Sequence, residues 1–494
     1  MSDMKTPGVY IAERNPLAGA VVEVATAVPA FIGYTARAED GGKSLFGVPW
    51  RIGSMAEFER FFGGAPPARF SLTEAADGAF RVGAQRYTVA QTGPRFRLYH
   101  GMRHYFTNGG GACWVVSVGD YTHAPSEEAL VRGISALQGE RESSLLVVPD
   151  AVSLALEACI GLQQQMLRQG SDARQRQRFA ILDVPNGDQE LDSPRDPVND
   201  FCRRLGQTGL INGAAYFPYL DTTVVDPHEV DWRHIEHASL TGTVAAMVRA
   251  DAQASKDVKR LLDAAELGDQ TARPAGAAEL HEALIAGSPA YGALMAEICR
   301  QMNRLGPCAA MAGVYAWVDH ERGVWKAPAN VRVAGVVMPA VPVSQEQQEG
   351  LNLSPQGQSI NAIRSFVGEG VLVWGARTLD GNSLDGRYVN VRRTLMMVEE
   401  SCRLACKALV FEPHVAHTWV AIQSMLGDFL TILWKRGGLA GAVPEQAFSV
   451  QCGLGETMTA EDVQQGILRV TVQVAVSRPA EFIEITFQQP MQVS

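Results

Sequence analysis

The sequence has few cysteines and few charged residues for its length. Eight cysteines are scattered over 494 residues, and Asp, Glu, Lys and Arg together make up 19% of the chain, below the roughly 25% of an average globular protein. A cysteine density this low is typical of reduced, buried thiols and excludes a disulfide scaffold. We therefore expect synthesis and folding in a cytoplasm.

Long apolar runs and an excess of positive charge are also missing. No run approaches the ~18 apolar residues that a membrane span requires, and Met1 to Pro7 holds no hydrophobic signal segment. The net charge is −10, which gives no general attraction to nucleic acid or anionic lipid. We expect neither membrane insertion nor nucleic-acid binding.

The hydrophobic content of the chain is high enough to form several hydrophobic cores. Hydrophobic residues make up 46% of the chain, too many for a disordered protein. At about 100–200 residues per domain, the length predicts about three domains.

Strand-like and helix-like segments alternate through the first half of the chain. Residues 31–35, 113–116, 145–148 and 179–183 have the apolar composition of buried strands. Helical patterns lie between them, at 55–62, 98–106, 126–137 and 154–168. Such alternation predicts an α/β domain with a largely parallel sheet. Residues 221–300 lack a clear period and are interpreted as an insertion of helices and loops.

The last 110 residues predict an α+β domain. Apolar residues recur at steps of three and four in two stretches, one from Leu395 to Leu409 and one from Trp419 to Leu433, so each predicts one helix. Strict alternation then predicts a half-buried strand over 470–476 and a final strand over 483–487. At the other end, Val21 to Val24 is also β-prone, so extended segments begin and end the chain.

No fragment gives a convincing catalytic or metal site. Gly53-Ser54-Met55-Ala56 resembles the serine motif of subtilisin-type proteases, but there the serine follows its histidine, whereas the first histidine here is His100. Cys402 and Cys406 with His414 and His417 do not have a usual zinc spacing. We expect no enzyme activity, no metal and no cofactor, with an α/β hydrolase as the remote alternative.

Motifs in family order resemble contractile tail sheath proteins over nearly the whole chain. The opening motifs are TPGVYI at 6–11, AVPAFIGYT at 27–35, EFERFFGG at 57–64, FTNGGGACWVV at 106–116 and YFPYL at 216–220. The resemblance is strongest at DHERGVWKAPAN (319–330), VWGARTL (373–379), RYVNVRR (387–393) and residues 429–450. The ending RPAEFIEITFQQ (478–489) is similar to sheaths of extracellular contractile injection systems. The sheath of a contractile bacteriophage tail is the close alternative.

The resemblance implies a structural subunit that polymerises as stacked hexameric rings around an inner tube and contracts without nucleotide hydrolysis. Implied partners are copies of itself, the inner tube protein, baseplate and terminal cap proteins and possible sheath paralogues. It implies assembly in a bacterial cytoplasm and release as part of the particle. It also implies a subtilisin-like middle domain without catalytic residues and a C-terminal α+β sheath domain with extended terminal arms.

The family pattern carries roles onto particular residues. In the family, N- and C-terminal arms of neighbouring subunits complete a small sheet, a role carried onto Val21, Val22, Glu23, Val24, Glu481, Phe482, Ile483, Glu484, Ile485, Thr486 and Phe487. The tube-facing surface is placed near the second C-terminal helix, which makes Lys435 and Arg436 candidate contacts to an acidic tube. Composition alone also allows these two cations to serve only the helix C-terminus.

The resulting division has four parts. We expect an N-terminal arm at 1–30, an N-terminal α/β region at 31–120, a middle domain at 121–375 with an insertion at about 221–300, and a C-terminal domain at 376–494 whose arm is 481–494.

Overall fold

The computed structural model describes residues 20–170, 177–191, 196–251, 255–267 and 277–482. These residues form two compact units. The larger, here called the body, holds residues 26–321 and 327–389. The smaller, here called the terminal unit, holds the described residues up to 25, a short return segment at 322–326, and the chain from 390 onward.

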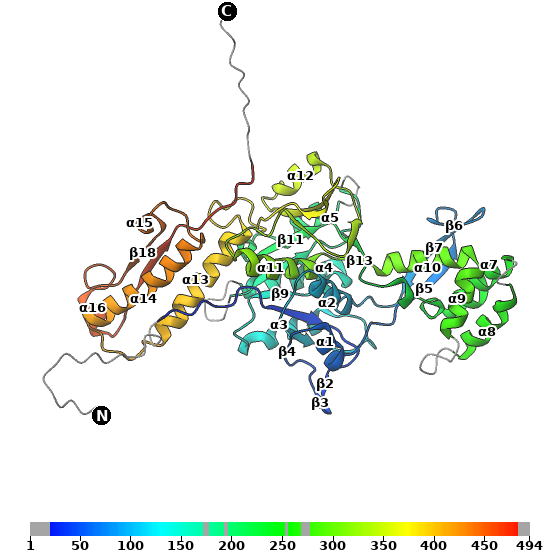
Figure 1. Cartoon of the computed structure of the whole chain (residues 1–494), viewed down its shortest axis with the longest axis horizontal. Coiled ribbons are helices and arrows are strands. Elements are labelled where there is room, and N and C mark those ends of the chain that lie inside the picture. Colours follow the sequence, from blue (N-terminus) through cyan, green and yellow to red (C-terminus); the bar gives the residue numbers. More distant parts are fainter. Residues whose placement is uncertain (1–19, 171–176, 192–195, 252–254, 268–276, 483–494) are drawn as a thin grey trace, which may run out of the picture. The chain divides into compact units, whose positions relative to one another are not determined.

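The body is built on one nine-stranded sheet (Figure 1). Its first strand, β1 (Pro29–Gly33), lies inside the sheet rather than at an edge, and six neighbouring strands, β8 to β16 in the order below, are parallel. The spatial order is β14 (Val331–Arg332), β17 (Gly370–Val373), β16 (Ile360–Phe366), β11 (Gly213–Phe217), β10 (Phe179–Asp183), β9 (Leu145–Val147), β1, β8 (Cys113–Ser117) and β4 (Trp50–Ile52). The edge strands β4 and β14 pair antiparallel.

Helices cover both faces of this sheet. All five residues of β1 are buried; Ala30 and Ile32 join the cluster formed with α3 (Glu127–Ala136), α4 (Leu156–Gln169) and α5 (Pro197–Leu205). On the opposite face Phe31 meets Tyr105 of α2 (Leu98–Thr107) at 4.9 Å between ring centroids. On that same face Tyr216 hydrogen-bonds Tyr315 of α11 (Cys308–Arg322) at 2.6 Å. Burial on both faces explains the continuous apolar strands seen in the sequence, and the mixed α/β class is confirmed.

A separate hydrophobic cluster holds the predicted insertion together. A three-stranded sheet of β5 (Arg69–Glu74), β7 (Gln85–Thr92) and β6 (Phe80–Val82) contributes Phe70, Leu72, Tyr87 and Val89 to it. Its helices come from much later in the chain: α7 (Ala245–Ala250), α8 (Val258–Leu267), α9 (Ala277–Gly287) and α10 (Pro289–Met302). This cluster is thus assembled from two distant stretches, and the sequence analysis interpreted only the second, at 221–300, as an insertion.

Short elements complete the body. They are β2 (Glu39–Asp40), β3 (Lys43–Ser44), α1 (Met55–Phe62), β12 (Leu220–Thr222), α6 (His237–Ser239), β13 (Arg304–Leu305), β15 (Val336–Pro339) and α12 (Gln345–Asn352).

The terminal unit packs two long helices against a two-stranded sheet. The helices are α13 (Val389–Lys407, from Asn390 within this unit) and α14 (Ala416–Lys435), and the strands are β18 (Phe448–Gln451) and β19 (Thr471–Val474), with the short helices α15 (Pro444–Ala447) and α16 (Ala460–Gln464). Ile422, Leu426, Phe429 and Leu433 of α14 are buried as predicted. Gly437, at φ 85°, follows that helix, a backbone conformation that favours glycine.

The predicted strand over 470–476 is confirmed as β19, and Val472 and Val474 pack on the helices while Thr471 and Gln473 are exposed. Val21 to Val24 is extended but forms no strand within the described chain. Of the predicted C-terminal arm strand, Ile483, Glu484, Ile485, Thr486 and Phe487 lie outside the described residues.

Candidate assembly surface

The sheet of the terminal unit is open along most of both long edges. Phe448 pairs with Val474 and Val450 with Val472, and the Ala475 N–H donates to the Ala447 carbonyl oxygen. In this antiparallel register the N–H and C=O groups of Val450, Val472 and Val474 point away from the partner strand. Among the described residues these groups find no partner, although Leu439 already pairs with Val476 beyond the end of β19. Such an edge can accept another strand.

Residues 20–25 lie along the helices of the same unit, and we call them the arm root (Figure 1). Val21 and Val24 pack against the hydrophobic cluster of α13, α14 and the sheet. The Val24 N–H donates to Ser401 Oγ on α13 at 3.1 Å. Val22, by contrast, is 79% exposed. The side chains of Val21 and Val24 and the Val24 N–H therefore hold the arm root on this unit.

Trp325 anchors the return segment in the core of the terminal unit. It is buried and packs with Met397, Phe429 and Leu433. Its carbonyl oxygen accepts from Asn390 Nδ2 at 2.8 Å, an amide that also donates to the Ser477 carbonyl. The chain reaches Trp325 through Gly323, where φ is 90° and a Cβ would lie 2.4 Å from the indole. Glycine is therefore needed at this position of the 319–330 motif.

The two candidate tube contacts lie at the end of α14 and differ in their surroundings. Arg436 Nη1 donates to Glu23 Oε2 of the arm root at 2.5 Å. Its guanidinium carbon also lies 4.9 Å from the centroid of a Trp325 ring. Lys435 is exposed, and its ammonium has no ion-pair partner in the part of the chain that the structure describes. Of the two, Lys435 thus presents its charge without a counter-ion among the described residues, whereas Arg436 is paired with Glu23.

The last two described residues, at the start of the predicted C-terminal arm, are exposed. Glu481 and Phe482 are both exposed, Phe482 to 78%.

The carboxyl edge of the body's parallel sheet is where an α/β enzyme would place its chemistry. Asp150 follows β9 and Asp183 ends β10, and burial raises the pKa of each to about 6. Both carboxylates bind backbone: Asp150 accepts from the N–H groups of Tyr34 at 2.9 Å and Arg97 at 2.5 Å, and Asp183 accepts from Cys308 at 2.6 Å. They fix loops and the start of a helix.

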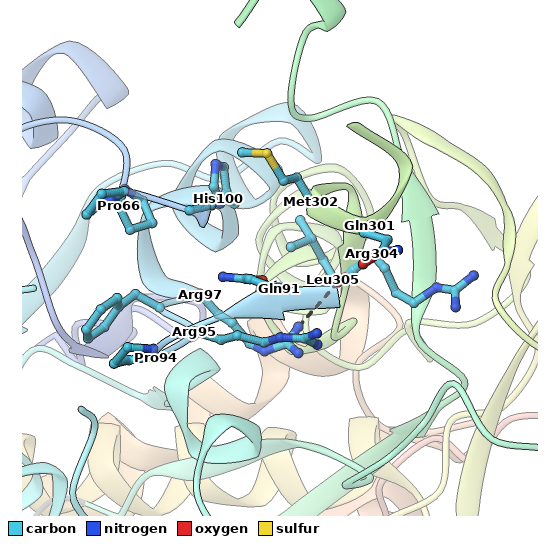
Figure 2. A pocket seen from close by; sticks show the side chains of 13 residues that line it. Pro66, Gln91, Pro94, Arg95, Arg97, His100, Gln301, Met302, Arg304 and Leu305 are labelled. Carbon is cyan, nitrogen blue, oxygen red and sulfur yellow. Dashed lines mark hydrogen bonds between the residues drawn. The ribbon is translucent and has the colours of Figure 1, made fainter. Parts of the chain in front are cut away.

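A small pocket of the body lies where the chain enters and leaves the insertion, at 66–68, 91–97 and 301–305 (Figure 2). Arg95 and Arg97 lie next to each other in it, and Arg97 Nη1 donates to the Arg304 carbonyl oxygen at 3.3 Å. Burial lowers the pKa of the lining His100 to about 4, so this imidazole is neutral at pH 7. No carboxylate, hydroxyl, thiol or amine lines the pocket. Since nucleophilic catalysis needs such a group beside a base such as His100, the pocket gives the hydrolase alternative no support.

The other fragments that resembled active sites have structural roles. Ser54 is the N-cap of α1, where its Oγ accepts from the Glu57 N–H at 3.3 Å. His414 accepts from Trp419 Nε1 at 3.0 Å. Within the described ranges no group of three or more His, Cys, Asp or Glu residues is placed to hold a metal ion, and no helix is long and apolar enough to cross a membrane.

Comparison with known proteins found a family model and a relative that each match part of this chain. A family model described as the phage tail sheath C-terminal domain matches residues 383–489. The tail sheath protein of Burkholderia phage BcepMu is 32% identical over 117 residues, which are 22% of this chain and 24% of that protein. The aligned segment thus spans about a quarter of the length of that relative.

Two solved structures match over nearly the full length. One is the sheath of the extracellular contractile injection system PVC in its contracted state, with TM-score 0.60, 27% identity and 99% of both chains covered. The other is the contracted helical sheath of the anti-feeding prophage AFP, with TM-score 0.62, 28% identity, and 98% of this chain and 99% of that one covered.

These matches confirm the resemblance to contractile tail sheath proteins that the sequence indicates. In its family-model match and in its fold the chain is similar to structural sheath proteins. It is similar to the sheath subunits of extracellular contractile injection systems and of contractile phage tails.

Proposed function

We propose that this chain polymerises as stacked hexameric rings around an inner tube and contracts to drive that tube through a target envelope. The observation that carries the proposal is the open sheet β18–β19, whose outer backbone groups have no partner among the described residues. The full-length similarity to two contracted sheaths supports it. The sheath of a contractile phage tail is the alternative, supported by the match to the BcepMu protein.

Strand addition by neighbouring subunits would join the rings while letting the bodies move. The N-terminal arm, whose root includes Val21 to Val24, and the C-terminal arm at 481–487 are assigned to add to this sheet in neighbouring subunits. Each added backbone hydrogen bond stabilises the contact by about 1 kcal/mol, so a short ladder holds firmly without requiring rigid packing between bodies. Contraction would then be a change between two packings of the bodies, with the ladders preserved and no nucleotide hydrolysed.

Further parts of the proposal follow from the same similarity. The middle domain is assigned a subtilisin-like fold without catalytic function, which the parallel sheet with helices on both faces supports. Partners would be the tube, the baseplate, terminal cap proteins and possible paralogues. Assembly would take place in the bacterial cytoplasm, with release in the particle.

Lys435 and Arg436 are proposed as cations of the tube-facing end of α14. Lys435 would make the direct contact to an acidic tube surface, because its charge has no counter-ion in the described chain. Arg436 would add positive potential while its guanidinium stays on Glu23.

Removal of either arm tests the proposal. We expect that a chain lacking residues 1–20 or 481–494 folds with an unchanged melting temperature but forms no striated tubes in negative-stain electron microscopy. The matched control keeps residues 481–494 but scrambles their order, which destroys the apolar alternation of Ile483, Ile485 and Phe487 at constant length and composition. It should also fail to assemble. Full-length sheaths from either truncated chain would refute the proposal.

A further inference from the structure

Three parts of the chain that are far apart in sequence meet at Arg436. Its guanidinium binds Glu23 of the arm root, 413 positions earlier, at 2.5 Å. The same group lies over Trp325 of the return segment at 4.9 Å. Trp325 is buried and hydrogen-bonded through its carbonyl oxygen, so it offers a fixed surface on which the guanidinium rests. Arg436 therefore connects the arm root to the most rigidly held residue of the return segment.

We propose that Arg436 is the positioning residue of the N-terminal arm: through Glu23 it holds residues 20–25 on their own subunit and so fixes the point from which the arm departs toward a neighbour. This inference rests on the proposed function, because an arm that departs has a purpose only in an assembly. It assigns Arg436 a role distinct from binding the tube.

The attachments of the arm root include apolar packing, a backbone hydrogen bond and an ion pair, and of these three the ion pair depends on charge. Val21 and Val24 insert into the apolar cluster, and the Val24 N–H donates to Ser401 Oγ. The valines can slide on an apolar surface, whereas a carboxylate bound by a guanidinium is held in direction as well as in distance. Glu23 thus defines the register of the arm root, and Val22 is left pointing outward.

An arginine suits this position better than a lysine. A planar guanidinium can stack on the indole and bind the carboxylate in the same orientation, whereas an ammonium cannot do both equally well. The pair is half exposed, with side-chain exposures of 49% for Arg436 and 34% for Glu23, so salt screens it. We expect its loss to shift the balance between docked and released arm root by a few-fold to about tenfold.

Charge reversal on either side, followed by a swap, tests the inference. Arg436→Glu and Glu23→Arg should each raise hydrogen exchange of the Val24 amide in the unassembled subunit by a few-fold to about tenfold, and each should lower the yield of sheaths. The double variant Glu23→Arg/Arg436→Glu should restore both readouts in large part. Lys435→Glu, a charge reversal of the adjacent cation, should leave Val24 exchange unchanged. Arg436→Lys should restore only part of the protection.

The exchange measurement separates this inference from the proposed function, because it needs no sheath. If the wild-type chain forms no sheaths, the proposed function fails while the effect on Val24 still tests the contact. Unchanged Val24 exchange in Arg436→Glu, or a double variant no better than the single ones, would overturn the inference. If a charge-reversal variant misfolds, Glu23→Ala takes its place. It removes the carboxylate at an exposed position and should also raise hydrogen exchange of the Val24 amide.

Discussion

The body and the terminal unit solve the problem of burying a sheet in different ways. In the body the interior strand β1 is buried along its whole length, and helices cover both faces of the sheet. In the terminal unit β18 and β19 are only half buried, and their outward backbone groups stay unpaired within the described chain. The body is thus complete as a folded core, whereas the terminal unit leaves bonds to be made by other segments.

The distribution of exposed apolar side chains agrees with this contrast. Around the two long helices of the terminal unit, large apolar side chains face solvent at Val410, Phe411, Val415, Val420 and Ile432. A unit of about a hundred residues has little interior to spare, so this exposure is costly unless a partner covers it. The comparison indicates that stability and assembly are assigned to different regions of the chain.

Truncation of Trp325 should have the largest effect on the difference between the two units, because the core of the terminal unit depends on this side chain. Trp325→Ala leaves a large cavity in the terminal unit, and we expect a loss of about 3–5 kcal/mol in its free energy of unfolding. Calorimetry with limited proteolysis should show the terminal unit unfolding first while the body stays protected. Trp317→Ala, which truncates a 36% exposed tryptophan of the body, should cost much less. Equal losses from both changes would contradict the anchoring role.

The body alone should respond to mild acid through its buried ionisable groups. Burial raises the pKa of Asp150 and Asp183 to about 6, so their contribution to stability increases as pH falls through 6 toward 4. Burial lowers the pKa of His100 and His104 to about 4, so their contribution is lost as pH falls from 6.5 toward 4. The two effects oppose each other over the same range.

Asp183→Asn should therefore make the body more sensitive to acid. Without that carboxylate the histidine effect is less opposed, and stability at pH 5 relative to pH 7 should fall by about 1 kcal/mol more than in the wild type. Melting temperatures at the two pH values measure this difference. A variant whose pH dependence matches the wild type would show that Asp183 does not titrate in this range.

The smallest effect concerns strain at the loop between the helices of the terminal unit. Phe411 is fully exposed and has φ 76°, a conformation that costs a residue with a side chain about 1 kcal/mol. Phe411→Gly should relieve that strain and raise the stability of the isolated subunit by up to about 1 kcal/mol. Val410→Gly, at the exposed neighbour without positive φ, should not stabilise. Equal changes in the free energy of unfolding for the two variants, measured by denaturant titration, would contradict the role of strain at Phe411.

Sequence periodicity predicted elements whose burial pattern is local. The apolar stripe from Trp419 to Leu433 gave α14, and the alternation over 470–476 gave β19. The sheet over 69–92 escaped prediction because its buried side chains pack on helices more than 150 residues later. No local pattern in the sequence shows such a long-range contact.

The same reason limited the prediction of the site. Lys435 and Arg436 are indistinguishable as neighbouring cations in sequence, and only the fold brings Glu23 and Trp325 to one of them. Trp325 lies in a motif that carried the family resemblance, but its anchoring role depends on contacts with α13 and α14. The assignments of both arms and of the tube contact stay predictions.

The return segment has a consequence for modular exchange. The chain passes between the two units after residues 25, 321, 326 and 389, so the terminal unit is not one continuous stretch. A cassette cut to the family-model boundaries, 383–489, would leave behind both Trp325 and Glu23. Recombination that moves such a cassette between sheaths would carry Arg436 without either of its partners. An exchange of this unit would therefore keep the contact only if residues 20–25 and 322–326 moved with it.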